Sequence, residues 1–307
     1  MKYVAGLDGG GTKTAVTIAD EHGRKIHAFT SGAINYNGQD EASIRDSFRH
    51  MMAEIGRACG GLEHCAHIVI GAAGISNPAV RDRLTANVRE HGFAGGLTIT
   101  GDHVTALCGA LESPYGIILI AGTGSICYGQ AESGLSHRAG GCGHLIDDEG
   151  SGYSIGRSLL AAVAKANDGR ISPTVITELV YKRLRMDSIR QIIEFVHDPS
   201  KNKKDIASLA PILTDACEAG DEAALAIARQ SAASLLELVI PVAERLDMRE
   251  GKLALAGSVL LKNAFVRGEF EERLGRAYPR MRCVQAPDDA SGGAVLMALQ
   301  EMAKAQA

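Results

Sequence analysis

Two glycine-rich stretches decide the fold of this chain. The first is Asp8-Gly9-Gly10-Gly11-Thr12-Lys13-Thr14, which follows the apolar run Tyr3–Leu7. The second is Ala121-Gly122-Thr123-Gly124-Ser125, which follows the apolar run Ile117–Ile120. Each apolar run is predicted to be a strand, and each glycine stretch is predicted to turn the chain into a second strand. Glycines let backbone N–H groups surround an anionic oxygen, and a Thr hydroxyl adds another donor. Both turns are therefore predicted to bind phosphate.

The first turn also carries charged side chains. Asp8, at the end of its strand, could hold a metal-bound water near the phosphates, and Lys13 adds positive charge. A plain hairpin is the alternative, but a hairpin turn needs one or two glycines, not three followed by Thr-Lys. The GxxxxGK[ST] order of a Walker A loop is absent.

The pattern of strand, turn and strand occurs twice, which indicates an internal duplication. We expect an α/β chain of two domains, 1–114 and 115–288, with a final helix at 289–307 that packs back on the first domain. Ligand is expected in a cleft between the domains. The second domain is expected to be largely helical. Its predicted helices are Tyr153–Ala166, Pro173–Leu184, Ser188–His197, Ile206–Ala219 and Glu222–Leu246.

The composition narrows the class of protein. The 307 residues are 46% hydrophobic and 22% charged with a net charge of −4, as expected for a globular protein of about two domains. The absence of Lys/Arg blocks argues against nucleic-acid or membrane partners. Seven cysteines without a CxxC pair indicate free thiols in a reducing compartment. With no signal segment or membrane-length apolar run visible in the sequence, we expect a cytoplasmic protein.

Three polar residues stand at positions with more than one interpretation. Asp102 follows the predicted strand Leu97–Thr100 and opens a helix, where Asp is a favoured N-cap. Asp148 lies in an acidic run that could cap the next helix or hold a cation. Asn35 occurs in a stretch typical of a turn.

Further motifs occur in an order that resembles a known family. They are Gly71-Ala72-Ala73-Gly74, Gly101-Asp102, Gly140-Gly141-Cys142-Gly143-His144, Asp148-Glu149-Gly150-Ser151-Gly152-Tyr153 and Ala256-Gly257-Ser258-Val259. With the two glycine turns they resemble the BadF/BadG/BcrA/BcrD ATPase family, and most closely its N-acetylglucosamine kinase branch in the actin-like, Hsp70 and sugar-kinase superfamily. The resemblance covers essentially the whole chain, and it implies two ribonuclease-H-like (actin-like) domains.

The resemblance also implies an activity and a set of site residues. The activity is ATP-dependent phosphorylation of the 6-hydroxyl of N-acetylglucosamine or a close relative (glucosamine, N-acetylmuramic acid or glucose), with Asp102 as general base. Asp8 would hold Mg²⁺ through water, and the family suggests a homodimer. The implied sugar contacts are Asn35 (or Asn37), Asp102, Ser125, Gly141, Cys142, Gly143 and Asp148. The implied ATP contacts are Gly9, Gly10, Gly11, Thr12, Lys13, Thr123, Gly124, Gly257 and Ser258.

Two other functions stay open at this point. Relatives that pass electrons to a dehydratase bind an iron–sulfur cluster and carry a cysteine immediately before the Gly-Thr-Gly turn. Here that stretch is Leu119-Ile120-Ala121, and the nearest cysteine, Cys127, follows the turn. A nucleotide-switched actin or chaperone relative is the other alternative, but the chain looks short for that class, and the sugar-side residues would have no role.

Overall fold

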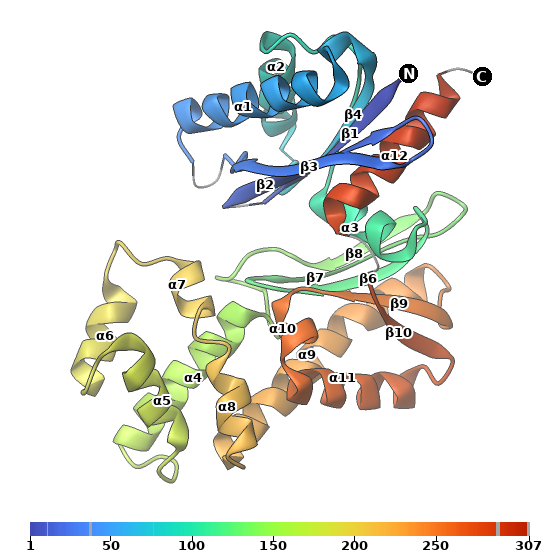
Figure 1. Cartoon of the computed structure of the whole chain (residues 1–307). Helices are drawn as coiled ribbons and strands as arrows, with labels where there is room; N and C mark the ends of the chain where they lie inside the picture. The colour runs from blue at the N-terminus through green and yellow to red at the C-terminus, as the bar shows by residue number, and fades with distance from the viewer. Residues whose placement is uncertain (11, 37–38, 76, 287–288, 306–307) are drawn as a thin grey trace. The chain divides into compact units, whose positions relative to one another are not determined.

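The computed structural model describes residues 1–10, 12–36, 39–75, 77–286 and 289–305. The chain divides into two compact units (Figure 1). The first unit is Met1–Gly116 with Ala286–Ala307, and the second is Ile117–Gln285. The C-terminal segment therefore returns to the unit that contains the N-terminus.

The first unit is built on a five-stranded sheet with the order β3-β2-β1-β4-β5. β1, β2 and β3 form an antiparallel meander, whereas β4 and β5 run parallel to β1. A parallel pair needs a crossover, and helices supply it. The strands are β1 (Tyr3–Gly9), β2 (Lys13–Asp20), β3 (Lys25–Gly32), β4 (Cys65–Ala72) and β5 (Gly96–Thr100).

Helices cover both faces of this sheet (Figure 1). Alternate strand residues face opposite sides, so Ala5 and Ile68 pack with α1 and α2 while Val4 and Val69 pack with α12. α3 lies along α12. The helical elements of this unit are α1 (Glu41–Cys59), the 3₁₀ turn η1 (Leu62–His64), α2 (Pro78–Glu90), α3 (Asp102–Leu111) and α12 (Ala290–Lys304).

Glycines allow α12 to approach β1 and α3 closely. A side chain at Gly6 would collide with the backbone of Ser291, and one at Gly293 would collide with the backbone of Thr105 and Gly109. The start of α12 is thereby fixed against the sheet, with consequences for the site described below.

The second unit repeats the plan of the first. Its sheet has the order β10-β9-β6-β7-β8, with β6 in the central place that β1 has in the first sheet. β7 and β8 are antiparallel, and β9 and β10 run parallel to β6. The internal duplication and the mixed α/β class are confirmed. The strands are β6 (Gly116–Ala121), β7 (Ser125–Gln130), β8 (Ser136–Gly140), β9 (Gly251–Ala256) and β10 (Met281–Gln285).

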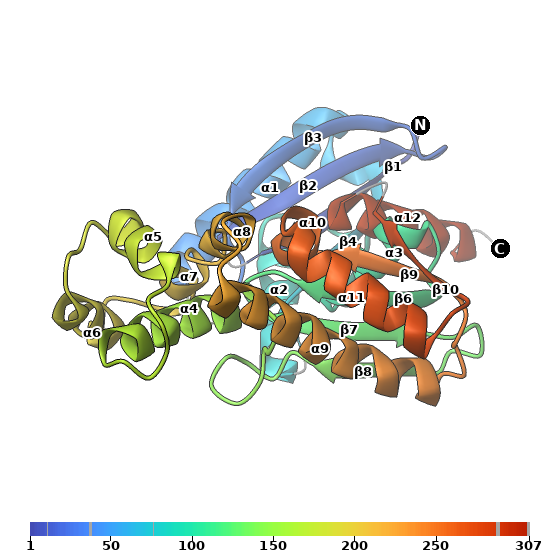
Figure 2. The same ribbon diagram turned by 90° about the horizontal axis from the view of Figure 1, so that it is seen from below.

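Helices make up most of the rest of the second unit, and Figure 2 shows α9 and α11 side by side. One expected helix is wrong, because Ile206–Ala219 is two short helices. Pro211 lies between them, since its ring removes an N–H donor and clashes with the preceding turn. The helices are α4 (Gly152–Asn167), α5 (Val175–Leu184), α6 (Ile189–His197), α7 (Lys203–Ala207), α8 (Ile212–Glu218), α9 (Glu222–Arg245), α10 (Ser258–Lys262) and α11 (Ala264–Ala277).

Of the helices that the structure describes, α9 alone has the length and apolar composition that would cross a membrane. α9 contacts α4, α8, α11, β7 and β8, and Ala232, Leu235, Val239 and Val242 on it are completely buried. One face of α9 therefore packs in the core of the second unit, and a core helix passes the same test of length and composition.

Candidate active site

The carboxyl ends of three neighbouring strands meet in the first unit. Asp8 on β1 pairs in register with Gly71 on β4, and Gly71 pairs with Thr100 on β5. Asp102 follows two residues after Thr100. Strand spacing is about 4.8 Å, so the topology alone carries the Asp8 and Asp102 backbones to the same edge of the sheet.

The carboxyl group of Asp8 lies in a negative environment. Burial, together with the nearby carboxylates of Asp102 and Asp289, raises the pKa of Asp8 to about 6. Excess negative charge around a partly buried carboxylate fits a divalent cation. No cluster of three ligating side chains exists among the described residues. The arrangement therefore suits Mg²⁺, which keeps several waters and uses one or two carboxylates together with substrate phosphates.

Asp102 is the first residue of α3, and the N-cap position belongs to Gly101. The expectation that Asp102 caps the helix is therefore wrong. Its Oδ1 accepts a hydrogen bond from the backbone N–H of His103 at 2.9 Å, and the His103 ring lies 3.5 Å away. The side chain is 47% exposed. A half-exposed carboxylate at a helix N-terminus can accept a proton from a bound ligand.

Asp289 was not among the residues singled out from the sequence. It is the N-cap of α12, where its Oδ1 accepts hydrogen bonds from the Ser291 hydroxyl at 2.7 Å and the Gly292 N–H at 3.0 Å. Burial opposes ionisation, but these hydrogen bonds hold the pKa of Asp289 below its ordinary value. In the sequence, Asp289 has only the pattern of an ordinary helix N-cap. It lies near Asp8 only because α12 returns to the first sheet.

The first glycine turn lies between β1 and β2. The Gly10 N–H donates to the carbonyl oxygen of Lys13 at 3.1 Å, and Thr12 and Lys13 are exposed. A side chain at Gly9 would collide with Ile34, which is buried beside the turn. Asn35, which is half-buried, is therefore the neighbour of a residue that packs on Gly9. Two predicted residues, Gly11 and Asn37, lie outside the described residues.

The second glycine turn, between β6 and β7, is fastened to the start of α4. The carbonyl oxygen of Gly122 accepts from the Gly152 N–H at 2.8 Å, and that of Thr123 accepts from the Tyr153 N–H at 3.3 Å. The Gly122 N–H donates to the Gly124 carbonyl oxygen at 2.9 Å. The DEGSGY segment thus holds the turn in place through backbone hydrogen bonds.

Asp148 and Ser125 are brought together beside this turn. Asp148 is buried, has a left-handed φ of 66°, and accepts the Ser125 N–H at 3.1 Å. The Ser125 hydroxyl donates to the carbonyl oxygen of Glu149 at 2.7 Å. Both residues therefore shape the turn, whatever further contact they make with a ligand.

Gly141 and Gly143 have φ values of 74° and 97°, in the left-handed region that favours glycine. Between them Cys142 is exposed, and its N–H donates to Asp147 Oδ2 at 2.9 Å. Asp147 thus closes the loop that carries these three predicted sugar contacts.

A cavity of about 510 Å³ lies within the second unit. Two of the predicted ATP residues, Thr123 and Ser258, line it together, and Gly257 joins β9 to α10 at its edge. A side chain at Gly257 would collide with the backbone of Ala121, and its φ of 88° also requires glycine. The predicted residue Gly124 is not part of the lining but adjoins Thr123.

Polar residues from the helical part of this unit also line the cavity. They are Arg183, Lys204, Ser208, Thr214, Asp215 and Lys262. No sequence pattern points to these residues, because they come from separate segments that meet only after folding. Their charges suit a ligand with both hydrogen-bonding edges and anionic groups.

Two duplicated units, each with a glycine/threonine turn beside its central strand, define the actin-like class of ATPase and sugar-kinase domains. Residues 5–298 match the model of the BadF/BadG/BcrA/BcrD ATPase family, and the chain belongs to that family.

Curated relatives and a solved structure agree with this assignment. The chain is 34% identical over 304 residues to an N-acetylmuramic acid/N-acetylglucosamine kinase of Clostridium acetobutylicum, covering 98% of this chain and 99% of that protein. It is 28% identical over 308 residues to an N-acetyl-D-glucosamine kinase of Dictyostelium discoideum, covering 96% and 97%. Its fold matches the crystal structure of an assigned N-acetylglucosamine kinase of Chromobacterium violaceum with a TM-score of 0.79 and 24% identity, covering 98% of this chain and 99% of that one.

Proposed function

We propose that this protein is an ATP-dependent kinase that phosphorylates the 6-hydroxyl of N-acetylglucosamine or a close relative. The relatives at full length support the amino-sugar kinase class. Within the chain itself, the observation that carries the proposal is the shared location of Asp8 and Asp102. One carboxylate has the surroundings of a cation site, and the other is free to act as a base.

In the proposed reaction, the 6-hydroxyl oxygen attacks the γ-phosphorus of ATP, and the bond to the β–γ bridging oxygen breaks to release ADP. Asp102 accepts the hydroxyl proton. A base of this kind contributes about 10²–10⁴-fold in rate. A bound Mg²⁺ neutralises phosphate charge, and Asp8 would hold it through water. The sugar contacts are proposed at Asn35, Ser125, Gly141, Cys142, Gly143 and Asp148.

The cavity of the second unit is proposed to hold the nucleoside of ATP, with the phosphates toward Thr123 and Gly124. Its size and mixed polar lining suit such a ligand. Gly9, Gly10, Gly11, Thr12 and Lys13 of the first turn are proposed as further phosphate contacts. A cytoplasmic location and a homodimer remain predictions.

The electron-transfer alternative has little support in the second unit. Cys127, the cysteine nearest the Gly-Thr-Gly turn, is completely buried, and burial raises the pKa of its thiol far above the ordinary range. A cluster ligand must be a thiolate that the iron can reach. Cys127 therefore has the surroundings of a packing residue.

The first experiment measures ADP release with Mg-ATP across N-acetylglucosamine, glucosamine, N-acetylmuramic acid and glucose. Asp102→Asn is assayed in parallel, with Asp82→Asn on the exposed face of α2 as the matched control. We expect one of these sugars to stimulate turnover, and Asp102→Asn to lower kcat by about 10²–10⁴-fold. Asp82→Asn should leave kcat unchanged.

No stimulation by any of the four sugars would reject the kinase proposal. Sugar-dependent turnover that survives in Asp102→Asn would retain the kinase but remove Asp102 as its base. Phosphate position is read from the product by NMR, and a product phosphorylated at another hydroxyl would reject the 6-position.

A further inference from the structure

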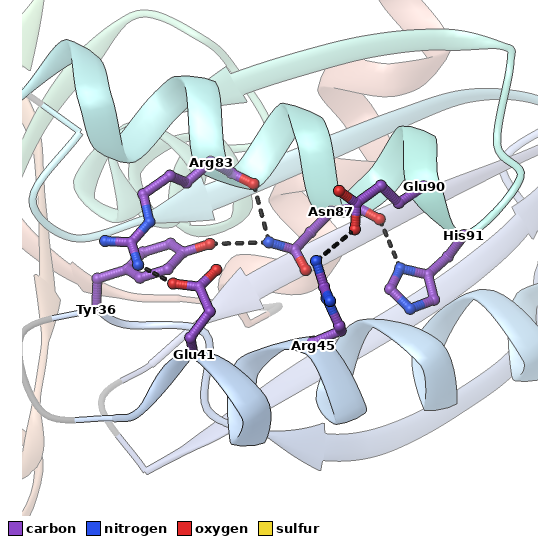
Figure 3. Close-up of polar contacts among 7 residues, drawn as sticks. All are labelled: Tyr36, Glu41, Arg45, Arg83, Asn87, Glu90 and His91. Carbon is purple, nitrogen blue, oxygen red and sulfur yellow. Dashed lines mark hydrogen bonds and ion pairs between the residues drawn. The ribbon is translucent and has the colours of Figure 1, made fainter.

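Asn35 and Tyr36 follow β3, and Tyr36 contacts α2. The ring of Tyr36 lies against α2, as Figure 3 shows. Its hydroxyl oxygen accepts a hydrogen bond from Asn87 Nδ2 at 2.9 Å. The guanidinium carbon of Arg83 lies 4.0 Å from the centre of the Tyr36 ring, which is cation–π geometry.

Arg83 contacts the chain on both sides of residues 37–38. Besides stacking on Tyr36, it forms an ion pair with Glu41, the first residue of α1 (Figure 3). One side chain of α2 therefore contacts both Tyr36 and the start of α1.

The buried side chain of Asn87 lowers the stability of the fold, and the packing of α2 gives no reason for a polar residue there. It is 4% exposed, and its Oδ1 has no hydrogen-bond partner among the described residues. Buried polar atoms of folded proteins are nearly always paired, and an unpaired one destabilises the fold. The neighbouring buried positions of α2 are the apolar Leu84 and Val88. The amide provides N–H donors that an apolar residue cannot: one is directed at the Tyr36 hydroxyl at 2.9 Å and one at the Arg83 carbonyl oxygen at 3.0 Å.

Asn35 is consequently restrained through both of its neighbours. On one side Ile34 is buried against Gly9 of the first glycine turn, and on the other side Tyr36 is held by α2. A side chain between two fixed neighbours has little backbone freedom. Pre-organisation of this kind reduces the ordering cost of binding a ligand.

We propose that Tyr36 is a positioning residue of the sugar site, which Asn87 and Arg83 hold so that Asn35 is ordered before the sugar binds. The inference rests on the proposed function, because it takes Asn35 as a sugar contact. Tyr36 acts through Asn35 and through the loop, not through contact with the reacting atoms. Burial raises the pKa of Tyr36, although the Arg83 charge opposes this, so the hydroxyl stays neutral and can accept from Asn87 at physiological pH.

The test compares Tyr36→Phe and Arg83→Gln with wild type. Tyr36→Phe removes the acceptor oxygen and keeps the ring, whereas Arg83→Gln removes the stacking charge and its pair with Glu41. We expect each variant to raise KM for the sugar by about 5- to 10-fold, roughly the effect of one lost hydrogen bond. kcat should stay within about twofold and KM for ATP should not change, since uniform sugar binding is what is lost.

Arg45→Gln is the matched control. Arg45 on α1 pairs with Glu90 on α2 at 3.0 Å, and its charge lowers the pKa of Tyr36 less than that of Arg83 does. Arg45→Gln removes an ion pair between the same two helices. If the kinetic changes came only from a general loosening of α1 against α2, Arg45→Gln would show them to the same extent. Thermal unfolding of all three variants shows whether any kinetic change merely follows lost stability.

The sugar dissociation constant, measured by calorimetry without nucleotide, provides a readout that does not depend on turnover. Weaker sugar binding in Tyr36→Phe and Arg83→Gln but not in Arg45→Gln supports the inference. Unchanged sugar affinity in the first two, equal weakening in all three, or a parallel rise in KM for ATP overturns it. Wild-type protein that neither binds nor phosphorylates any sugar rejects the proposed function itself, and the inference falls with it.

Discussion

At the scale of single residues, the ionisation of Asp8 links stability to ligand binding. The pKa of Asp8 is about 6 in the folded protein against an ordinary value of 3.8, because burial and two nearby carboxylates disfavour its charge. A carboxyl group with a raised folded pKa stabilises the fold below its unfolded pKa. That contribution is lost as pH rises from about 4 to about 6. At neutral pH the ligand-free protein therefore contains an unfavourable charge at this position.

Replacing this charge should stabilise the protein and abolish its activity. Asp8→Asn is expected to raise the free energy of unfolding at pH 7 by about 1–3 kcal/mol, because each unit of pKa shift corresponds to about 1.4 kcal/mol. The gain should shrink towards pH 4, where Asp8 of wild type is protonated. Denaturant unfolding at both pH values measures it. Mg²⁺ with ADP should stabilise wild type more than the variant. Lower stability of the variant at pH 7 would contradict the electrostatic account.

At the scale of elements, the junction of β9 and α10 joins the second sheet to the cavity of the second unit. Gly257 combines a φ of 88° with close approach to the Ala121 backbone. Gly257→Ala should therefore destabilise the protein by more than about 2 kcal/mol, since strain and a clash with rigid backbone add. It should also raise KM for ATP, because Ala121 leads directly into the second glycine turn.

Gly251 provides the matched control at the start of the same strand. Its φ is 98°, but a side chain there would meet nothing within 4 Å. Gly251→Ala should cost only the strain, about 1–2 kcal/mol, and leave KM for ATP unchanged. Thermal unfolding and ATP saturation curves distinguish the two variants. Equal effects on KM would mean that the clash with Ala121 is irrelevant to nucleotide binding.

The elements differ in how well the sequence predicts them. β7 begins at Ser125, directly after the predicted glycine turn, because that turn marks the start of the strand. The helix predicted at Ile206–Ala219 is wrong, since its apolar periodicity continues through Pro211 while the backbone cannot. The glycine turns were visible because they are local in sequence. The sequence did not indicate Asp289, Arg183 or Lys204. Tertiary packing alone brings Asp289 near Asp8, and Arg183 and Lys204 to the cavity of the second unit.

At the scale of the whole molecule, the two units share one fold but carry different polar and charged side chains at corresponding places. β1 and β6 each lead into a glycine turn, but Asp8 before the first turn has the apolar Ile120 or Ala121 as its counterpart before the second. The first unit carries the acidic cluster, and the second carries the cavity with Arg183, Lys204 and Lys262. The two repeats therefore carry different charged groups and are not interchangeable.

The proposed contacts predict that nucleotide and sugar each slow hydrogen exchange at their own set of backbone amides in the intact chain. Mg-ADP without sugar should slow exchange at the second turn and the start of α4, because Gly152 and Tyr153 fix that turn. The sugar without nucleotide should slow exchange at residues 33–36 and the start of α3 in the first unit, and at residues 141–143 in the second. At 100 times Kd, ligand lowers the population of the open state by about 100-fold, so the protection is readily measured. β10 contributes no residue to the lining of the cavity and is the internal control.

Protection by Mg-ADP that is absent from the second turn would contradict the nucleotide assignment. Protection by sugar that is absent from 33–36 would remove Asn35 from the site.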